Sequence, residues 1–596
     1  MTTFSASRQG FSVESAIAPI AVLLALSLPV WVESKFLLFL ATQAGVYMIV
    51  AMGLNFVSGY AGQTSLAQGA LTAVGAYTAA IAMLDGHVSF WIAVLAAIVS
   101  TTMVGSIMAL PALRLSAWYF ALISLTFAQV VGDLIVEWRS ITRGFSGIVN
   151  IPRPSLFGHS FSDKDLYLLV VVVVVAMFLV LRNLIRSRIG RAMVAVRDNP
   201  LAAMASGASL LSVKMFAFGV SAALAGLGGA FLAVQKTVIS VDDFAVDFSI
   251  FFLLIIVVGG SGRLWGPIVG TLVFFLVPET LGALQSWRVL VYGVALLLLM
   301  LFAPNGVVGA LESAWRRHRP AGRSSHRVGE LIEQLPIKGA RLEVRDIKKR
   351  FGGIQALDGA ALSVDAGATH AVVGPNGSGK TTLLNMICGF FRVDAGLVLL
   401  GQFPLLGRKP HVIARLGVGR TFQTPKLLGG MTVLDNVLLG AYASERASIV
   451  EIALRLPRAR REGAELRAIA MHFLSFVGLA SRAYDLAGDI PHGQQRLLEI
   501  ARVLIGRPRL LLLDEPAAGL SMVELDRLGE LVRSIAKLGT TVVIVEHHLE
   551  LVGEICDNVT VLERGRVLAL GTPAEVFSHP EVMSAYMGRT TKELAS

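Results

Sequence analysis

The sequence predicts a polytopic α-helical membrane domain followed by a soluble α/β domain of the P-loop type. Hydrophobic residues make up 54% of the 596 residues and charged residues only 16%. The apolar runs are concentrated before about residue 310, and ordinary soluble composition follows. A glycine-rich loop, GPNGSGKTT, starts at Gly374 after a short apolar run. These observations divide the chain into a membrane half and a soluble half.

Apolar runs long enough to cross a bilayer recur through the first half. They lie near residues 16–32, 36–58, 64–84, 88–111, 116–136, 166–186, 213–235, 248–277 and 287–304. The run 248–277 is too long for one untilted span and contains four glycines, so it is long enough for two short helices. We therefore expect about eight to ten spans. The first run has no obvious small-residue cleavage site, which favours a retained span over a signal peptide.

The charges indicate the orientation of these spans and explain the net charge of +11. Basic clusters follow two apolar runs, as is typical of the cytoplasmic side. They comprise Arg182, Arg186, Arg188, Arg191, Arg197, Arg316, Arg317, Arg319 and Arg323. Asp242, Asp243 and Asp247 lie together on the expected opposite face. This topology explains the charge without nucleic acid as a partner, and the two cysteines in the soluble half fit a reducing cytoplasm.

Small residues and a basic segment mark two further features of the first half. Ala222, Gly226 and Ala230 recur at four-residue spacing, which predicts close helix packing rather than a substrate role. The Gly-, Ala- and Ser-rich stretch from Gly53 suits a broken or buried helix that lines a pathway. Residues 312–340 have the composition of a basic linker at the membrane surface, where arginines could contact anionic lipid as well as act as a passive tether.

The loop from Gly374 predicts a nucleotide site in the second half. An apolar strand, a glycine-rich turn and a helix form the context that a P-loop requires, with backbone N–H groups converging on phosphate. Lys380 would reach the β- and γ-phosphates, and the Thr381 hydroxyl would ligate Mg²⁺. The residues expected to bind ATP here are Gly374, Pro375, Asn376, Gly377, Ser378, Gly379, Lys380, Thr381 and Thr382.

A second motif, RLLLLDEP, follows the P-loop in the order typical of such ATPases. Its four leucines suit a buried parallel strand. Asp514 at the end of this strand is expected to hold Mg²⁺, and Glu515 to polarise the attacking water. The pair predicts ATP hydrolysis as well as ATP binding.

Three stretches of the first half resemble the membrane subunits of bacterial branched-chain amino acid importers of the ABC type. They are GLNFVSGYAGQTSLAQGALTAVGAYTAA from Gly53, SRIGRAMVAVRDNPLAAMASGASLLSVK from Ser187 and LLIIVVGGSGRLWGPIVG from Leu253. In ABC importers a short cytoplasmic helix docks on the ATPase, often with a Glu-Ala-Ala pattern and a Gly four residues later. Ala202, Ala203 and Gly207 match that spacing while Leu201 replaces the Glu, so the resemblance implies a coupling helix here.

The second half resembles the ATPase subunit of the same importer family. The resemblance assigns Gln423 to the Q-loop, where it contacts Mg²⁺, His547 to the switch position on the γ-phosphate, and Phe351 to the aromatic that stacks on adenine. The helical insert from Leu454 and the ending GTPAEVFSHPEVMSAYMG also match the family. The implied fold is an ABC ATPase domain with a helical subdomain.

The family signature departs from its usual form, Leu-Ser-Gly-Gly-Gln. The stretch here is IPHGQQ, in which Gly493 and Gln494 are kept while Pro491 and His492 replace the Ser and the first Gly. Proline removes a hydroxyl and a backbone donor. Because this family's ATP sites form across a dimer, we expect the altered signature to serve the partner's P-loop and to make the two sites unequal.

The sequence therefore predicts a membrane domain over residues 1–311, a basic linker over 312–340 and an ABC ATP-binding domain over 341–596. The resemblance implies ATP-driven import of branched-chain or related hydrophobic amino acids across a bacterial inner membrane, with the ATPase domain in the cytoplasm. It also implies ATP and Mg²⁺ as cofactors and three kinds of partner: a second permease subunit, a second ATPase subunit and a periplasmic binding protein. A non-identical pair of subunits is favoured by the uneven signature.

Three alternatives stay open. The same fold could carry urea, short amides or aromatic acids. An exporter is less favoured, because exporters usually have six spans and long cytoplasmic helices. A membrane-anchored ATPase without transport would not need so many glycine-rich spans.

Overall fold

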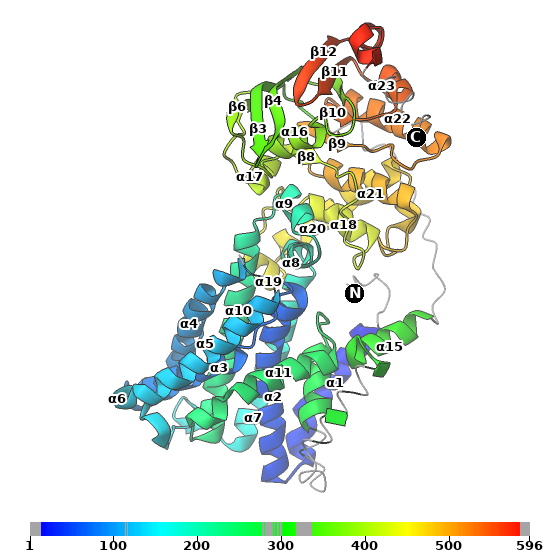
Figure 1. Ribbon diagram of the computed structural model, residues 1–596. Coiled ribbons are helices and arrows are strands. Elements are labelled where there is room, and N and C mark those ends of the chain that lie inside the picture. The colour runs from blue at the N-terminus through cyan, green and yellow to red at the C-terminus, as the bar shows by residue number, and fades with distance from the viewer. Residues whose placement is uncertain are drawn as a thin grey trace. The chain divides into compact units, whose positions relative to one another are not determined.

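The computed structural model describes residues 13–113, 115, 117–276, 301–317 and 337–584, and single positions at 279, 290, 293, 294 and 297. The chain divides into two compact units, which are drawn in Figure 1. The helical unit takes in Met1–Asp198, Leu210–Gly322 and Ser448–Leu456. The α/β unit takes in Asn199–Ser209, Arg323–Ala447 and Pro457–Ser596.

The helical unit contains apolar helices, most of them long, that agree with the predicted spans. They are α1 (Val13–Trp31), α2 (Lys35–Leu54), α3 (Gln68–Leu84), α4 (Phe90–Met108), α5 (Ala117–Glu137), α7 (Asp163–Ile185), α10 (Leu210–Lys236), α11 (Val246–Gly259) and α12 (Gly266–Thr271). Within the described residues, 5 helices are long and apolar enough to cross a membrane, and three shorter apolar helices accompany them. The helical unit is thus a polytopic membrane domain.

One predicted span is longer than the helix that forms, and another divides into two helices as its length and glycines allow. The run 64–84 becomes helical only at Gln68, because the Ser124 and Ser65 hydroxyls accept hydrogen bonds from the preceding backbone N–H groups of Leu66 and Ala67. The run 248–277 forms two short helices, as its glycines allow, with Gly260 at φ 116° in the turn between them. The predicted span 287–304 lies largely outside the described residues.

Small residues let three helices pack backbone to backbone, as their spacing predicts. A Cβ added at Gly75 of α3 would lie 2.5 Å from the Cα of Gly226 in α10, and one at Gly105 of α4 would lie 2.3 Å from the Cβ of Ala222. Neither approach leaves room for a larger side chain. This confirms that the small-residue faces serve helix packing.

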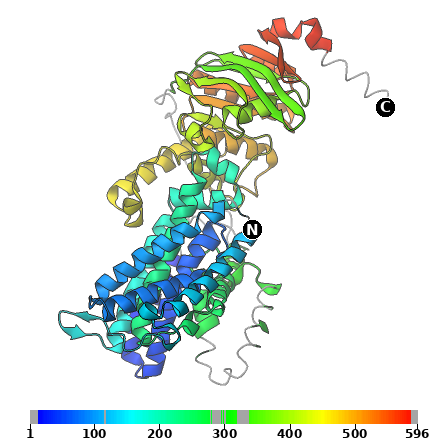
Figure 2. The ribbon, with the colours of Figure 1, turned by 60° about the vertical axis from the view of Figure 1, so that its left-hand side comes forward.

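The α/β unit contains two sheets, and Figure 2 shows the long strands β3 and β4 side by side in green. The six-stranded sheet has the order β12-β11-β5-β10-β9-β8, with every neighbouring pair parallel except β11 and β12. Its strands are β5 (Thr369–Val373), β8 (Val418–Arg420), β9 (Leu510–Asp514), β10 (Thr541–Val545), β11 (Asn558–Glu563) and β12 (Arg566–Gly571). The antiparallel sheet has the order β4-β3-β6-β7, built from β3 (Leu342–Phe351), β4 (Ile354–Val364), β6 (Ala395–Leu400) and β7 (Phe403–Pro404).

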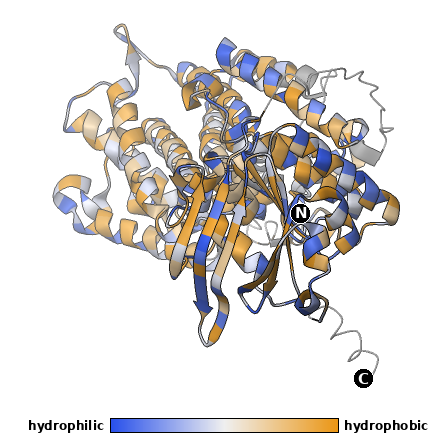
Figure 3. Cartoon of the chain, turned by 90° about the horizontal axis from the view of Figure 1, so that it is seen from above, coloured by the Kyte–Doolittle hydropathy of each residue, from blue (hydrophilic) through white to orange (hydrophobic). Residues whose placement is uncertain are grey.

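The central strands of the six-stranded sheet are buried along their whole length, as their unbroken apolar sequences require. Strands β3 and β4 of the antiparallel sheet instead have both buried and exposed positions. Strands in Figure 3 carry both the hydrophilic and the hydrophobic colour. Around the sheets lie the helices α16 (Lys380–Ile387), α17 (Pro410–Arg415), α18 (Val433–Gly440), α20 (Pro457–Phe476), α21 (His492–Leu504), α22 (Met522–Lys537), α23 (Leu549–Ile555) and α24 (Pro573–Phe577). One apolar core joins α18, α20 and α21, which form the predicted helical subdomain. Most of the predicted linker, residues 318–336, lies outside the described residues.

Candidate nucleotide site

The P-loop connects the buried strand β5 to the first turn of α16. Gly374 has φ 148°, and a Cβ there would lie 2.1 Å from the carbonyl oxygen of Leu562. Gly379 has φ 104°, and its Cβ would lie 2.7 Å from the carbonyl oxygen of Ala356. Only glycine fits these two positions, both because of the backbone conformation and because of the neighbouring backbone.

Lys380 holds the P-loop in its curved form. Its ammonium group is buried and donates hydrogen bonds to the carbonyl oxygens of Gly374, at 2.8 Å, and Pro375, at 3.0 Å. The buried Ser378 hydroxyl has no hydrogen-bond partner among the residues that the structure describes. The loop therefore presents a cation, a free hydroxyl and a helix N-terminus together, which suits a phosphate chain. The other predicted loop residues, Asn376, Gly377, Thr381 and Thr382, lie between β5 and the first turn of α16.

Asp514 ends β9 as a buried carboxylate. Its Oδ2 accepts a hydrogen bond from Arg420 at 3.0 Å, and the same guanidinium donates to Asn385 of α16 at 2.7 Å. Burial raises the pKa of Asp514, while Arg420 and the Thr381 hydroxyl act to lower it. Arg420 thus connects the strand that carries Asp514 to the helix that follows the P-loop.

Glu515 brings the three residues predicted to be catalytic into contact. Its Oε2 accepts a hydrogen bond from Gln423 at 2.8 Å, and its Oε1 lies 3.0 Å from the His547 Nε2. The backbone of Glu515 is held at φ 48° by two bonds, one from its N–H to the Val545 carbonyl and one from Arg496 to its own carbonyl. A residue in this strained conformation, fixed from both sides, is typical of a functional position.

Two buried residues that sequence reasoning missed support this group. Glu546, next to His547, accepts hydrogen bonds from the backbone N–H of Ala517 at 2.7 Å and of His547 at 3.1 Å, and burial raises the pKa of Glu546. Arg420 is the other, three residues before Gln423. Each of the two lies within three residues of a predicted site residue, which was the signal available in the sequence. The local sequence pattern does not show which groups they contact.

Phe351 lies apart from the Glu515 group, at the end of β3. Its ring is 41% exposed and packs edge-on against Phe391 at 5.3 Å, with the Lys349 ammonium 5.3 Å from the ring centre. The exposed face of this ring suits the predicted stacking on adenine. Its role in binding adenine stays a prediction.

The altered signature forms the N-terminus of α21. Pro491 is the N-cap and provides no side-chain hydrogen bond to the helix, and both Pro491 and His492 are exposed. A Cβ at Gly493 would lie 2.5 Å from the Glu524 carboxylate, so the kept glycine is needed for packing. The Gln494 Oε1 is buried and has no hydrogen-bond partner within the described part of the chain.

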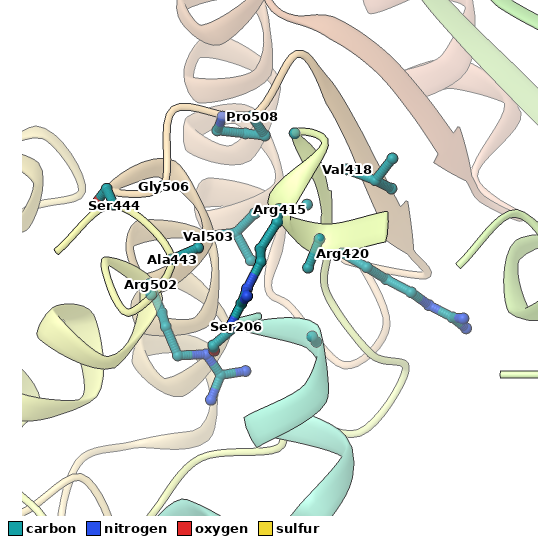
Figure 4. Close-up of a pocket in the computed structure, with 15 residues that line it drawn as sticks. Ser206, Arg415, Val418, Arg420, Ala443, Ser444, Arg502, Val503, Gly506 and Pro508 are labelled. Carbon is teal, nitrogen blue, oxygen red and sulfur yellow. The ribbon is translucent and has the colours of Figure 1, made fainter. Parts of the chain in front are cut away.

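The short helix α9 (Pro200–Ala205), which contains Ala202 and Ala203, packs within the α/β unit although its sequence falls in the first half. Arg415 of α17 donates a hydrogen bond to the Gly207 carbonyl at 3.1 Å. A cavity of about 240 Å³ lies beside this contact, and Figure 4 shows Arg415 directed toward Ser206. Gly207 itself has φ 86°, which a Cβ would disfavour.

Comparisons with known proteins agree with both halves of the chain. Residues 36–303 match the family described as branched-chain amino acid transport system / permease component. Residues 357–518 match the ABC transporter family, and residues 566–590 match the branched-chain amino acid ATP-binding cassette transporter family.

The similar curated proteins correspond to the second half alone. The high-affinity branched-chain amino acid transport ATP-binding protein BraF of Pseudomonas aeruginosa is 40% identical over 248 residues, which is 41% of this chain and 97% of that protein. The LivG protein of Escherichia coli is 37% identical over the same coverage. A crystal structure of the ADP conformation of an ATP-binding cassette is 33% identical, covers 42% of this chain and 99% of its own, and has a TM-score of 0.37.

Proposed function

The chain belongs to the branched-chain amino acid ABC transporter family, and on that premise we propose that it imports branched-chain or related hydrophobic amino acids across the bacterial inner membrane. It carries a permease domain and an ATPase domain on one polypeptide. The observation that carries the ATPase function is the meeting of Gln423 and His547 on the Glu515 carboxylate.

The proposal gives each group of the site a step in hydrolysis that its contacts support. The P-loop and Lys380 bind the phosphate chain, because the buried ammonium group and backbone N–H groups stabilise negative charge. Glu515 orients the attacking water and accepts its proton. His547 and Gln423 leave the carboxylate for the γ-phosphate when ATP binds, so that Glu515 becomes free to contact water.

The oxygen donors at the end of β9 fit a magnesium ion. Thr381, Gln423 and Asp514 offer a hydroxyl, an amide oxygen and a carboxylate, and Thr381 lies close enough to Asp514 to lower its pKa. Bound there, Mg²⁺ would neutralise charge on the β- and γ-phosphates. Asp514 would hold it on a rigid strand, because the strand is paired on both sides.

The proposal extends to coupling and to partners. Helix α9 is the coupling helix, supported by its packing in the α/β unit and by the Arg415 contact with Gly207. The missing Glu at Leu201 is replaced here by a hydrogen bond from an arginine to a backbone carbonyl. A second permease subunit, a second and non-identical ATPase subunit and a periplasmic binding protein complete the importer. The proposed contact with anionic lipid belongs to the basic linker predicted over residues 312–340, which starts within α15 (Gly306–Arg317).

Uptake of radiolabelled leucine in a deletion strain tests the function. Re-expressing the intact chain should restore ATP-dependent uptake. The Glu515→Gln variant should lower ATP turnover by roughly 100-fold or more while ATP still binds, because it lacks the proton acceptor. An exposed Glu554→Gln variant of the same chemistry should behave as the intact chain does.

Two results would contradict the proposal. Leucine uptake that is unchanged by deletion would exclude this cargo, and a Glu515→Gln variant with normal turnover would exclude the assigned base.

A further inference from the structure

Four segments of the helical unit meet around one asparagine, Asn55, which begins the π-helix η1 (Asn55–Tyr60). Its Nδ2 donates to the Arg263 carbonyl at 2.8 Å, and its Oδ1 accepts from the Gly262 N–H at 2.8 Å. Both ends of the buried amide are therefore used to fix the turn between α11 and α12. A Cβ at Gly59 would lie 2.3 Å from the Gly262 backbone nitrogen, so η1 and this turn touch directly.

Arg197, near the end of α8 (Arg188–Asp198), binds the same place. It donates to the Gly59 carbonyl at 2.6 Å, and a Cβ at Gly62 would lie 2.3 Å from its Cγ. Asp198 accepts two hydrogen bonds from the same guanidinium, at 2.7 and 3.2 Å. The side chain is thus held in one orientation. Asn199, the next residue along the chain, caps α9 by accepting from the Ala202 N–H at 3.2 Å.

Arg263 connects the turn between α11 and α12 to α15. It is 6% exposed, donates to the Glu312 carboxylate at 3.1 Å and donates to the Asn305 carbonyl at 2.7 Å. A Cβ at Gly306 would lie 2.4 Å from the Gly260 Cα, which brings the start of α15 onto the turn. Helix α15 is the last described element before the linker to the ATPase domain.

We propose that Arg197, Asn55 and Arg263 form a transmission node, in which they are positioning residues that keep ATP hydrolysis coupled to transport. The proposal rests on the proposed function of an ATP-driven importer. Movement of α9 reaches the node through Arg197, which is two residues from the α9 cap. Movement of α15 reaches it through the Arg263–Glu312 pair. From the node, both inputs act on η1 and on the α11–α12 turn.

The chemistry of the node favours this role over a passive fold contact. A buried arginine with a carboxylate costs desolvation that well-packed apolar residues would avoid. A π-helix is rare and occurs often at functional sites.

The test uses the full chain with its copurifying subunits in proteoliposomes, and compares leucine uptake with ATP hydrolysis. In Arg197→Gln and Arg263→Gln, hydrolysis and its KM for ATP should stay within about twofold of the intact chain, while uptake per ATP falls roughly fivefold or more. The double variant should lose more coupling than either single variant, because each residue carries a separate input to η1. Arg143→Gln is the matched control, since Arg143 forms an exposed ion pair with Asp85.

A second measurement does not depend on cargo. A fluorophore on Ser313→Cys in α15 should report a change on adding Mg-ATP, and Arg263→Gln should abolish that change. Where the arginine variants fail to fold, Glu312→Gln keeps the side-chain size and is measured the same way, and Arg263→Lys should recover part of the coupling.

Equal losses of uptake and hydrolysis, an unchanged ratio, or a persisting ATP-dependent signal in Arg263→Gln would each overturn the node. An ATP-dependent signal in the intact chain without leucine uptake would instead contradict the assigned cargo, and the node would still be testable by fluorescence.

Discussion

At the scale of single residues, the candidate catalytic groups are held in place by contacts with one another. Glu515 accepts from Gln423 and contacts His547, and its backbone is fixed by Arg496. These contacts hold the carboxylate still before ATP arrives. In the proposed mechanism ATP must therefore offer Gln423 and His547 better partners than Glu515, so we expect nucleotide binding to free the carboxylate.

His370 gives a stability prediction with a defined sign. Burial lowers the pKa of His370 from 6.5 to about 4, and its Nε2 lies 2.7 Å from the Thr560 hydroxyl. The neutral form is favoured in the folded chain, so its stabilisation is complete above pH 6.5 and is lost as pH falls through 4. The loss amounts to about 3 kcal/mol at about 1.4 kcal/mol per pKa unit.

The His370→Gln variant should therefore unfold with a flatter pH dependence between about 6.5 and 4. Scanning calorimetry of the full chain in detergent measures this as a smaller fall in Tm on acidification. His579→Gln, which changes an exposed imidazole, is the matched control. A slope equal to that of the intact chain would show that His370 is not the titrating group.

Sequence alone supplied the candidate catalytic residues, whose roles stay predictions, but not the residues that contact them. Gln423, Asp514, Glu515 and His547 each follow a strand or a recognisable motif in a fixed order, and such order is visible in one sequence. Arg420 bonds to Asp514, which lies 94 residues further along the chain, so only the folded sheet shows the contact.

At the scale of elements, helices and strands were predicted correctly where an unbroken apolar run determines them. The long spans and the buried strands β5, β9 and β10 follow directly from unbroken apolar runs. The start of α3 was missed by four residues, because serine hydroxyls bind the backbone ahead of it. Helix α9 packs in the α/β unit. A pattern of small residues in a loop predicts a docking helix there, but that pattern cannot show which residues the helix contacts.

The N-terminus of α21 gives a prediction for an element. Pro491 offers no side-chain cap, whereas Ser at a cap stabilises a helix N-terminus by about 1 kcal/mol. The double variant Pro491→Ser with His492→Gly restores the usual signature residues. We expect it to tighten ATP binding at the partner's site by roughly fivefold. Equilibrium titration of the purified complex with a non-hydrolysable ATP analogue, which binds at both sites without turnover, measures this.

The matched control for that experiment is Ser521→Ala, which changes a different helix cap in the same unit. It should leave ATP affinity unchanged. Unchanged affinity in the signature variant would show that the missing hydroxyl and donor do not weaken the partner's site.

At the scale of the whole molecule, the fusion places one intact P-loop and one altered signature on the same chain. The P-loop of this chain uses the partner's signature, and the altered signature of this chain serves the partner's P-loop. If this chain pairs with a non-identical ATPase subunit, as we propose, we expect the two ATP sites to be unequal and the site built on Lys380, Asp514 and Glu515 to carry most of the hydrolysis.

Lys380→Ala tests this inequality directly. It should lower the ATP turnover of the complex by roughly tenfold or more, because the buried ammonium group no longer binds phosphate in the better site. The equivalent substitution in the partner's P-loop should cost less than half of the turnover, since the site it disables is already the weaker one. Both are measured as steady-state phosphate release from the copurified complex.

Comparable losses from the two substitutions would contradict the inequality, and copurification of two copies of this chain without another ATPase would remove its basis. In a homodimer every site would combine an intact P-loop with Pro491 and His492. The turnover of such a homodimer would depend on the same signature that the Pro491→Ser, His492→Gly variant restores. The two experiments together therefore distinguish a complex with one weak ATP site from a homodimer in which both ATP sites are weak.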